Sequence, residues 1–274
     1  MEEAPEAGRA VRGRVQLTAI LSVRNVVKTF KNGSTVRAID DVSFEVNYDE
    51  FVCIIGPSGC GKSTLLRIMA GLETADSGQV LFRGEPITKP TPKVTMVFQT
   101  FGLLPWKTAM ENVELPMEVA GMPRAEAEGR ADRYLRMVGL GTFLGAYPHD
   151  LSGGMRQRVG VARALAIGPE VLLLDEPFSA LDELTARALR VLLLKIWSDS
   201  SLPTNNFVMV THNVEEAVMM ADRIIVMSPH PGRVVGELKV ELPRPRFEHL
   251  RDALFFDTVD KLMGMLSSNA EEQM

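Results

Sequence analysis

The stretch GPSGCGKST, residues 56–64, combines three glycines with a lysine and hydroxyl side chains at a fixed spacing. It matches G-x-x-x-x-G-K-[ST], in which the backbone curls so that successive N–H groups point at phosphate oxygens. Lys62 is expected to reach the β- and γ-phosphates of a nucleotide, and Ser63 to offer its hydroxyl to Mg²⁺. The alternative is a glycine-rich turn with an incidental lysine, but the strand and helix expected on either side favour a phosphate site. The residues predicted to bind phosphate are Gly56, Pro57, Ser58, Gly59, Cys60, Gly61, Lys62, Ser63 and Thr64.

Two acidic residues follow the apolar run in VLLLDEP, residues 171–177. Ligands of open parallel sheets bind at the carboxyl ends of the strands. Asp175 is therefore expected to hold Mg²⁺ through water, and Glu176 to polarise the attacking water as a catalytic base. Without the phosphate loop, two solvated acids at a strand end would be the better interpretation. With it, the two motifs together predict a nucleotide hydrolase.

A second anion site is predicted in LSGGMRQR, residues 151–158. Ser152 is a good helix N-cap, and Gly153 and Gly154 leave the first helical turn bare. The free N–H groups of such a helix terminus attract anions. An ordinary helix cap after a loop is the alternative for this segment taken alone.

Composition excludes several classes of protein. The 274 residues include 30 basic and 35 acidic side chains, a net charge of −5, which argues against a nucleic-acid binder. Cys53 and Cys60 form neither a disulfide framework nor a zinc pattern. No apolar run approaches the ~18 residues of a membrane span, and the N-terminus does not resemble a signal peptide. We therefore expect a cytoplasmic protein.

The elements that position these motifs follow from hydrophobic patterning. Four apolar runs are predicted to be strands buried on both faces, as in a parallel sheet: 51–55, 171–174, 207–210 and 223–227. Alternation at 42–46 and 79–82 predicts half-buried strands of an antiparallel piece. Helices that stop at a glycine are predicted over 62–70, 124–138 and 152–167. The fold class is therefore α/β, with a helical insertion.

In this order, the phosphate loop, LSGG and VLLLDEP resemble the Walker A, signature and Walker B motifs of the ATP-binding cassette (ABC) ATPases. Gln99, after the strand VTMVF, resembles the Q-loop glutamine, which contacts Mg²⁺ and water and senses the membrane partner. SALD, residues 179–182, resembles the D-loop. His212 resembles the H-loop histidine that contacts the γ-phosphate, and Phe30 has the position of the aromatic that stacks on adenine. Taken singly, His212 and Phe30 could each be an ordinary core or surface residue.

The resemblance implies a P-loop NTPase (RecA-like) parallel-sheet core with an N-terminal antiparallel β subdomain and an inserted helical signature subdomain. It implies ATP and Mg²⁺ as cofactors, and catalytic roles for Glu176, His212, Gln99 and Lys62. The adenine and phosphates would contact Phe30, the phosphate loop and Ser152–Gly154, and Mg²⁺ would be held by Ser63, Gln99 and Asp175. Met155 stands where glutamine is commonest in the signature, which removes a side-chain amide and leaves the backbone N–H groups.

The partners implied are integral membrane permease subunits and a second copy of the chain, or a paralogous ATPase, in an ATP-sandwiched dimer. An extracytoplasmic solute-binding protein would act indirectly, and no nucleic acid is expected. Such a subunit is peripheral on the inner face of the cell membrane. LLPW, TAMENV and the tail PHPGRVVGELKVELPRPR resemble the importers of nitrate, sulfonate, taurine and bicarbonate. An ATPase for another solute, an exporter subunit and a soluble ABC protein not tied to transport remain alternatives.

The expected domains are a disordered arm (1–19), a nucleotide-binding domain (20–240, with the helical subdomain at about 100–155), and a C-terminal segment (241–274). That segment contains an extended linker, an amphipathic helix and a tail. Its apolar stripe is expected to dock on the core: Phe247, Leu250, Leu254, Val259, Leu262 and Leu266. Trp106 is interpreted either as a permease contact or as packing inside the helical insertion. Cys60 is expected to be a thiolate favoured by the helix N-terminus.

Overall fold

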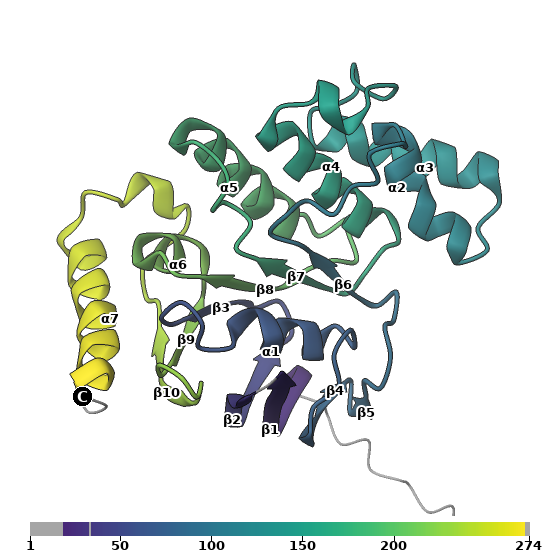
Figure 1. The fold of residues 1–274 in the computed structure, drawn as a ribbon. Helices are drawn as coiled ribbons and strands as arrows, with labels where there is room; N and C mark the ends of the chain where they lie inside the picture. The colour runs from purple at the N-terminus through teal and green to yellow at the C-terminus, as the bar shows by residue number, and fades with distance from the viewer. Residues whose placement is uncertain (1–18, 33, 272–274) are drawn as a thin grey trace, which may run out of the picture.

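The computed structural model describes residues 19–32 and 34–271 (Figure 1). The predicted arm therefore lies outside the described residues, except that Ala19 already opens the first strand. Among the described helices, none has both the length and the apolar character needed to cross a membrane.

A six-stranded sheet forms the centre, with strand order β10–β9–β3–β8–β7–β6. Five of its strands are parallel, and β10 runs antiparallel to β9. The strands are β3 (Phe51–Ile55), β6 (Val94–Val97), β7 (Val171–Asp175), β8 (Asn206–Thr211), β9 (Arg223–Met227) and β10 (Val234–Lys239). All four apolar runs that were predicted to be strands belong to this sheet, so the parallel α/β core is confirmed.

Each central strand is apolar throughout because both of its faces are covered. In β3, Phe51, Cys53 and Ile55 belong to the larger hydrophobic cluster, on the side of the helical layer. Val52 and Ile54 point to the other face and belong to a second cluster with helix α1 (Lys62–Met69) and the antiparallel sheet. Alternate side chains of a strand point to opposite faces, so a strand covered on both sides loses the alternation of polar and apolar residues.

The second sheet is antiparallel and has the order β2–β1–β4–β5. Its strands are β1 (Ala19–Asn32), β2 (Ser34–Asn47), β4 (Ser77–Phe82) and β5 (Glu85–Pro86). Figure 1 shows α1 between this sheet and the central one. The sequence predicted only fragments of β2 and β4, because β1 and β2 contain polar stretches and several register shifts. Neither β1 nor β10 was predicted.

The opposite side of the central sheet carries the remaining helices (Figure 1). They are α2 (Ala109–Val119), α3 (Arg124–Met137), α4 (Gly153–Ala166), α5 (Glu183–Trp197) and α6 (Val214–Met220), with a 3₁₀ turn at Pro148–Asp150. The helices α2, α3 and α4 pack on one another, and α4 also packs on β6. The helical insertion thus joins the central sheet through α4.

The C-terminal segment packs along the core. After β10, a 3₁₀ turn (Arg246–Glu248) leads to α7 (Ala253–Glu271), which contacts α6, β9 and β10. Val259 and Leu262 are buried as predicted. Leu254 is 49% exposed, so its place in the docking face was wrong. The inward face carries Phe255, Val259 and Leu262, at helical spacings of four and three residues, and Leu254 lies to one side of it.

Candidate nucleotide site

The phosphate loop joins β3 to α1, as predicted from the sequence. Gly59 and Gly61 have φ of 79° and 95°, a region that side chains with a Cβ rarely adopt. At Gly61 a Cβ would also lie 2.7 Å from the carbonyl oxygen of Ala38 in β2. Lys62 is buried, and its ammonium donates to the carbonyls of Gly56 and Pro57 at 2.8 and 2.9 Å. The loop thus holds its own lysine at the end of a helix whose dipole favours anions.

The prediction of a thiolate at Cys60 is wrong. The side chain of Cys60 belongs to the hydrophobic cluster around α1, and the residue is 0% exposed. Burial raises the pKa of the thiol, and Lys62 offsets this only in part. Desolvation therefore dominates over the positive potential of the helix terminus.

Asp175 ends β7 next to the phosphate loop. Its Oδ1 accepts a hydrogen bond of 2.7 Å from the Ser63 hydroxyl. Asp175 is 2% exposed, and burial raises the pKa of its carboxyl, while Ser63 and the cations Arg67 and Lys62 lower it. The buried carboxylate therefore faces a hydroxyl and two positive charges.

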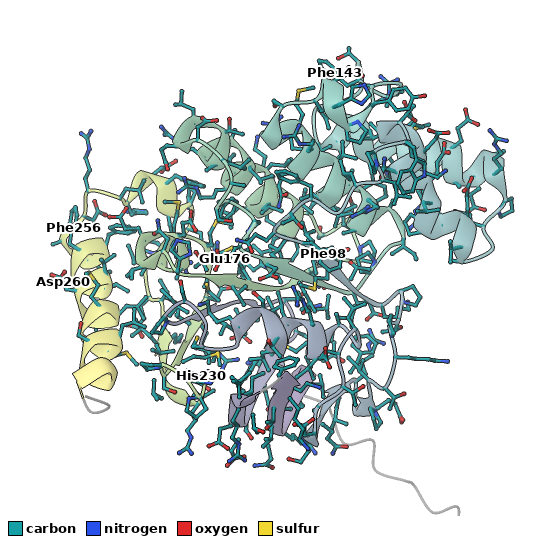
Figure 2. The ribbon with its side chains drawn as sticks, viewed as in Figure 1. Phe98, Phe143, Glu176, His230, Phe256 and Asp260 are labelled. Carbon is teal, nitrogen blue, oxygen red and sulfur yellow. The ribbon has the colours of Figure 1, made fainter. Side chains whose placement is uncertain are left out.

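Two of the other predicted catalytic residues, Gln99 and His212, lie at the carboxylate of Glu176. Gln99 Nε2 lies 3.4 Å and His212 Nδ1 3.3 Å from Glu176 Oε2. These three residues follow β6, β7 and β8, which are neighbours in the sheet. Glu176 has φ of 42°, uncommon for a residue other than glycine. Figure 2 shows it near the centre of the molecule.

The N-terminus of α4 is built as predicted. Ser152 caps the helix by accepting a hydrogen bond from the N–H of Met155 at 3.3 Å. Gly154 is needed for packing, since a Cβ there would lie 2.1 Å from Cγ2 of Thr185 on α5. The helices α4 and α1 pack on opposite faces of the central sheet, so the second predicted anion site is separate from the phosphate loop.

Phe30 lies near the end of β1, opposite Val36 of β2. Its ring packs against the cluster that contains α1 and Cys60. The ammonium of Lys28 lies 5.3 Å from the centre of the ring. The structure thus puts Phe30 in the β-hairpin that also supplies Ala38, the residue in contact with the phosphate loop.

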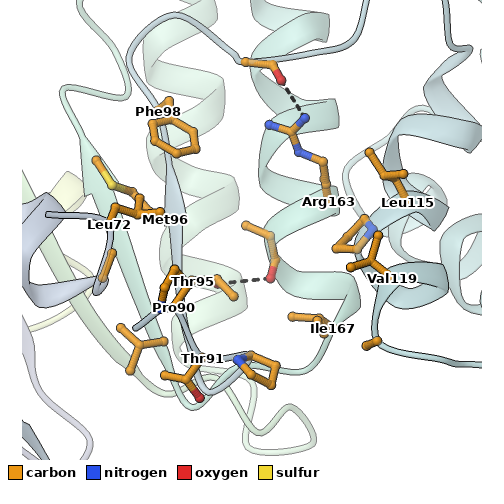
Figure 3. Close-up of a pocket in the computed structure, with 17 residues that line it drawn as sticks. Leu72, Pro90, Thr91, Thr95, Met96, Phe98, Leu115, Val119, Arg163 and Ile167 are labelled. Atoms are coloured by element: carbon orange, nitrogen blue, oxygen red, sulfur yellow. Dashed lines mark hydrogen bonds between the residues drawn. The ribbon is translucent and has the colours of Figure 1, made fainter. Parts of the chain in front are cut away.

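An apolar groove of about 630 Å³ lies beside Gln99, between the central sheet and the helical layer. Figure 3 shows Phe98 beyond β6 on one wall and Leu115 and Val119 of α2 on the other. Arg163 of α4 donates to the carbonyls of Gly102 and Phe101 at 2.7 and 3.1 Å, which ties the Q-loop to α4.

The backbone of the loop that carries Trp106 is hydrogen-bonded to the side chain of Asn112, which is 0% exposed. Its amide donates to the carbonyls of Leu104, Lys107 and Thr108, and its oxygen accepts from the N–H of Leu104. Trp106 itself is 70% exposed. The interpretation of Trp106 as packing inside the helical insertion is therefore wrong.

Sequence reasoning missed residues that position the site. The hydroxyl of Ser179 accepts from Gln99 Nε2 at 3.3 Å and donates to the carbonyl of Glu176 at 3.0 Å. Gly232 lies against the phosphate loop, where a Cβ would be 2.0 Å from the carbonyl oxygen of Cys60. SALD and PHPGR marked both segments, but neither motif indicates which atoms they contact.

Comparison with known proteins agrees with this geometry. The family model described as ABC transporter matches residues 39–179. A taurine import ATP-binding protein of Rhizobium johnstonii is 46% identical over 221 residues, which cover 81% of this chain and 83% of the relative. A nitrate import ATP-binding protein of Synechococcus elongatus is 46% identical over 212 residues, 76% of each chain. An ATP-binding cassette solved as a dimer in a post-hydrolysis state with ADP and Pi superposes with a TM-score of 0.71 at 35% identity, covering 81% of this chain and 100% of that one. The chain therefore belongs to the ABC transporter family and is one of its ATP-hydrolysing subunits.

Proposed function

We propose that this ATPase drives the import of small anions through a separate membrane permease. The observation that carries the proposal is the gathering of Asp175, Glu176, Gln99 and His212 after neighbouring strands, with Ser63 of α1 bonded to Asp175. Relatives named for the import of taurine, nitrate and bicarbonate support the solute class. LLPW and the segment after β9 carry the resemblance to this subfamily; Trp106 of LLPW is exposed, whereas Gly232 in the segment after β9 lies against the phosphate loop.

In the proposed reaction, the N–H groups of the loop Gly56–Gly61 bind the β- and γ-phosphates. Lys62 exchanges its hydrogen bonds with the loop carbonyls for oxygens of the γ-phosphate. The attacking water gives a proton to Glu176 as its oxygen bonds to the γ-phosphorus. The bond from that phosphorus to the bridging oxygen breaks, and ADP leaves with the electron pair. Gln99 and His212 hold the carboxylate, and His212 is proposed to contact the γ-phosphate.

The residues present fit Mg²⁺. Among the described residues, no three His, Cys, Asp or Glu side chains form a metal cage. Mg²⁺ does not require one, since it keeps several waters and binds one or two carboxylates together with substrate phosphates. Ser63, Asp175 and Gln99 supply that donor set, and the buried carboxylate of Asp175 favours a cation. When bound, the metal would neutralise charge on the phosphates.

We further propose that two copies of the chain enclose the nucleotide. The bare helix terminus at Ser152–Gly154 would meet the γ-phosphate of the ATP that is bound to the phosphate loop of a second copy. The dimer of the related cassette supports this arrangement. ADP alone would not reach both helix ends, so loss of the phosphate after hydrolysis would release the dimer, in keeping with a related cassette that is still dimeric with ADP and Pi.

The permease is proposed to contact the groove beside Gln99 and the exposed Trp106. The groove is apolar, borders the Q-loop and is lined by Val119, which is 81% exposed. A contact there would be transmitted to Glu176 through Gln99. The subunit would accordingly lie on the inner face of the membrane.

The experiment that tests this function combines two substitutions. Glu176→Gln keeps the shape of the side chain but cannot accept the proton, so turnover should fall by roughly 10²–10⁴-fold, and ATP should hold the dimer closed. Adding Ser152→Arg should return the protein to monomers, because a bulky side chain then occupies the approach of the phosphate. Size-exclusion chromatography with ATP and with ADP measures both effects. Normal hydrolysis by Glu176→Gln, or an ATP-bound dimer that survives Ser152→Arg, would refute the corresponding role.

A further inference from the structure

Glu216 is a buried carboxylate near His212 that has no role in the proposed reaction. Glu216, in the first turn of α6, is 9% exposed. Ionised carboxylates are rarely buried unless their oxygens are hydrogen-bonded or paired, since burial costs solvation free energy. Accordingly, burial raises the pKa of Glu216, while the Thr211 hydroxyl, Arg190 and His212 lower it. An apolar residue would avoid this cost, so the carboxylate requires an explanation.

The hydrogen bonds of Glu216 enclose His212. The hydroxyl of Thr211 donates to Glu216 Oε2 at 2.8 Å and accepts from the N–H of Asn213 at 3.1 Å. The side chain of Asn213 caps α6 by accepting from the N–H of Glu216 at 3.0 Å. Thr211 and Asn213, on either side of His212, are thereby both hydrogen-bonded to Glu216.

This pattern differs from an ordinary capping box. In that motif, the third residue of the helix bonds directly to the N–H of the N-cap residue. Here the N–H of Asn213 is bonded to Thr211, and Glu216 reaches past it to the Thr211 hydroxyl. The box therefore spans the end of β8 as well as the start of α6, with His212 between the two.

His212 depends on its backbone for its position. Its side chain is 56% exposed, so core packing does not hold it, yet its Nδ1 lies 3.3 Å from Glu176 Oε2. A displacement of about 1 Å in an active site can lower a rate about 10²-fold. Atoms that fix the backbone on both sides of His212 thus bear directly on catalysis.

We propose that Glu216 is the positioning residue for His212, acting through the hydroxyl of Thr211. The inference rests on the proposed function, because the catalytic part of His212 is itself proposed. Glu216 touches neither nucleotide nor water in this scheme. It holds the segment Thr211–Asn213 in the conformation that aims the imidazole at Glu176.

The test compares Glu216→Leu, which removes the acceptor at similar size, with Glu216→Gln, which keeps one. Glu216→Leu should lower kcat on the order of 10- to 100-fold, with KM for ATP within about 3-fold of the original, because the nucleotide contacts are unchanged. Glu216→Gln, made in the original protein, should keep kcat within about 3-fold of the original value. Glu215→Leu, the exposed neighbour on the same turn, is the matched control and should leave both constants unchanged. Thr211→Val should reproduce Glu216→Leu, and it serves if the latter does not fold.

A double-mutant cycle with His212→Ala separates positioning from general destabilisation. If Glu216 acts through His212, adding Glu216→Leu to His212→Ala should lower kcat no further. Equal additional loss in that background, or full kcat in both Glu216→Leu and Thr211→Val, would overturn the inference and leave the part of His212 intact. A His212→Ala protein with normal kcat would instead overturn the proposed part of His212, and the inference with it.

Discussion

Glu176 takes the left-handed backbone conformation at the point where the chemistry occurs. For residues other than glycine that conformation costs roughly 1–2 kcal/mol. The surrounding structure compensates, since the N–H of Glu176 donates to the carbonyl of Val210 at 3.1 Å and its carboxylate contacts Gln99 and His212. The conformation turns Glu176 away from the direction of the preceding Asp175. The two adjacent carboxylates can therefore take the two proposed roles, Asp175 at the metal ion and Glu176 at the attacking water.

Cys60 is predicted to be protected from thiol reagents although it lies in the phosphate loop. Its thiol is buried and its pKa is raised, so it should react only through local opening of the loop. An opening free energy of about 3 kcal/mol corresponds to labelling about 100-fold slower than in the unfolded chain. Mass-spectrometric mapping of a maleimide time course, in buffer and in urea, measures the ratio. Equal rates in the two conditions would show that the thiol is accessible.

Phe30→Ala is predicted to weaken ATP binding by about 1–3 kcal/mol, the range for stacking of a base on an aromatic ring. The ring packs against the second hydrophobic cluster and is only half-buried, so part of it remains exposed as a fixed surface. Titration with a fluorescent ATP analogue measures the loss. Val36→Ala, which removes the 40% exposed cross-strand neighbour, is the control and should bind normally. Unchanged affinity in Phe30→Ala would make this ring a core residue only.

At the scale of elements, the contact between α4 and α5 depends on the second glycine of the signature. Gly154→Ala should destabilise the protein by about 1–3 kcal/mol, because the new methyl group meets Cγ2 of Thr185. Thr185→Ser removes that methyl group and keeps the hydroxyl that bonds Asp182 at 2.7 Å, so it should restore part of the loss. Gly153→Ala, where the nearest atom would be 3.8 Å away, should fold normally. Urea unfolding measures all three, and a stable Gly154→Ala protein would contradict the contact.

The C-terminal segment is fastened to the core by Arg246, which is 3% exposed. Its guanidinium donates to the carbonyls of Leu242, Ala221 and Val240. Burial lowers its pKa to about 10, with Arg244 as a further cause, so it remains charged at neutral pH. Residues 242–246, expected to be an extended linker, are thus a packed part of the fold.

Arg246→Met is therefore predicted to destabilise the chain by about 1–3 kcal/mol, the range for leaving a buried hydrogen-bonding group without its partner. The three carbonyls would be left without their donor, and α7 would lose its fixed start. Thermal unfolding and limited proteolysis of the C-terminal segment measure the effect. Arg251→Met, an exposed arginine just before α7, is the control. An unfolding temperature equal to that of the control would show that the segment is held by its apolar contacts alone.

At the scale of the whole molecule, Trp106 is among the most exposed large apolar side chains of the described residues, at 70%. Trp106→Ala should change the free energy of unfolding by no more than about 0.5 kcal/mol, as expected for an exposed side chain. Basal ATP hydrolysis should persist, while solute transport in vesicles with the permease should be lost. Phe143→Ala, at another exposed aromatic of the helical layer (Figure 2), should transport normally. Transport at the original rate in Trp106→Ala would exclude a permease contact at that residue.

The outer side of α7 is a second exposed apolar surface. Figure 2 shows Phe256 and Asp260 on the side of α7 away from the central sheet, and Phe256 is 53% exposed. His230 lies at the far end of the turn that leads into β10 (Figure 2). The molecule thus separates its terminal helix from the groove beside Gln99, with the central sheet between them.

The sequence by itself determined the parallel sheet and the phosphate loop. A strand buried on both faces must be apolar at every position, and a loop that binds phosphate through consecutive N–H groups needs glycines at fixed spacing. Both requirements apply to residues that are neighbours in the chain, so the sequence of one segment is enough to predict the element. Gln99 and His212 were indicated by the resemblance of the ordered motifs to those of the ABC ATPases, and the structure places both beside Glu176.

Only the tertiary structure decided which atoms of distant segments meet. Cys60 was expected to be reactive from its place beside a helix terminus, but packing against the antiparallel sheet buries it and raises the pKa of its thiol. Leu254 was assigned to the docking stripe, but it is five residues before Val259, and the buried face of the helix runs through Phe255 instead. The contacts of Gly154 with Thr185, and of Gly232 with the phosphate loop, bring together separate elements. Local patterns report how a segment meets solvent or its own backbone, whereas desolvation and steric fit depend on the segment that packs against it.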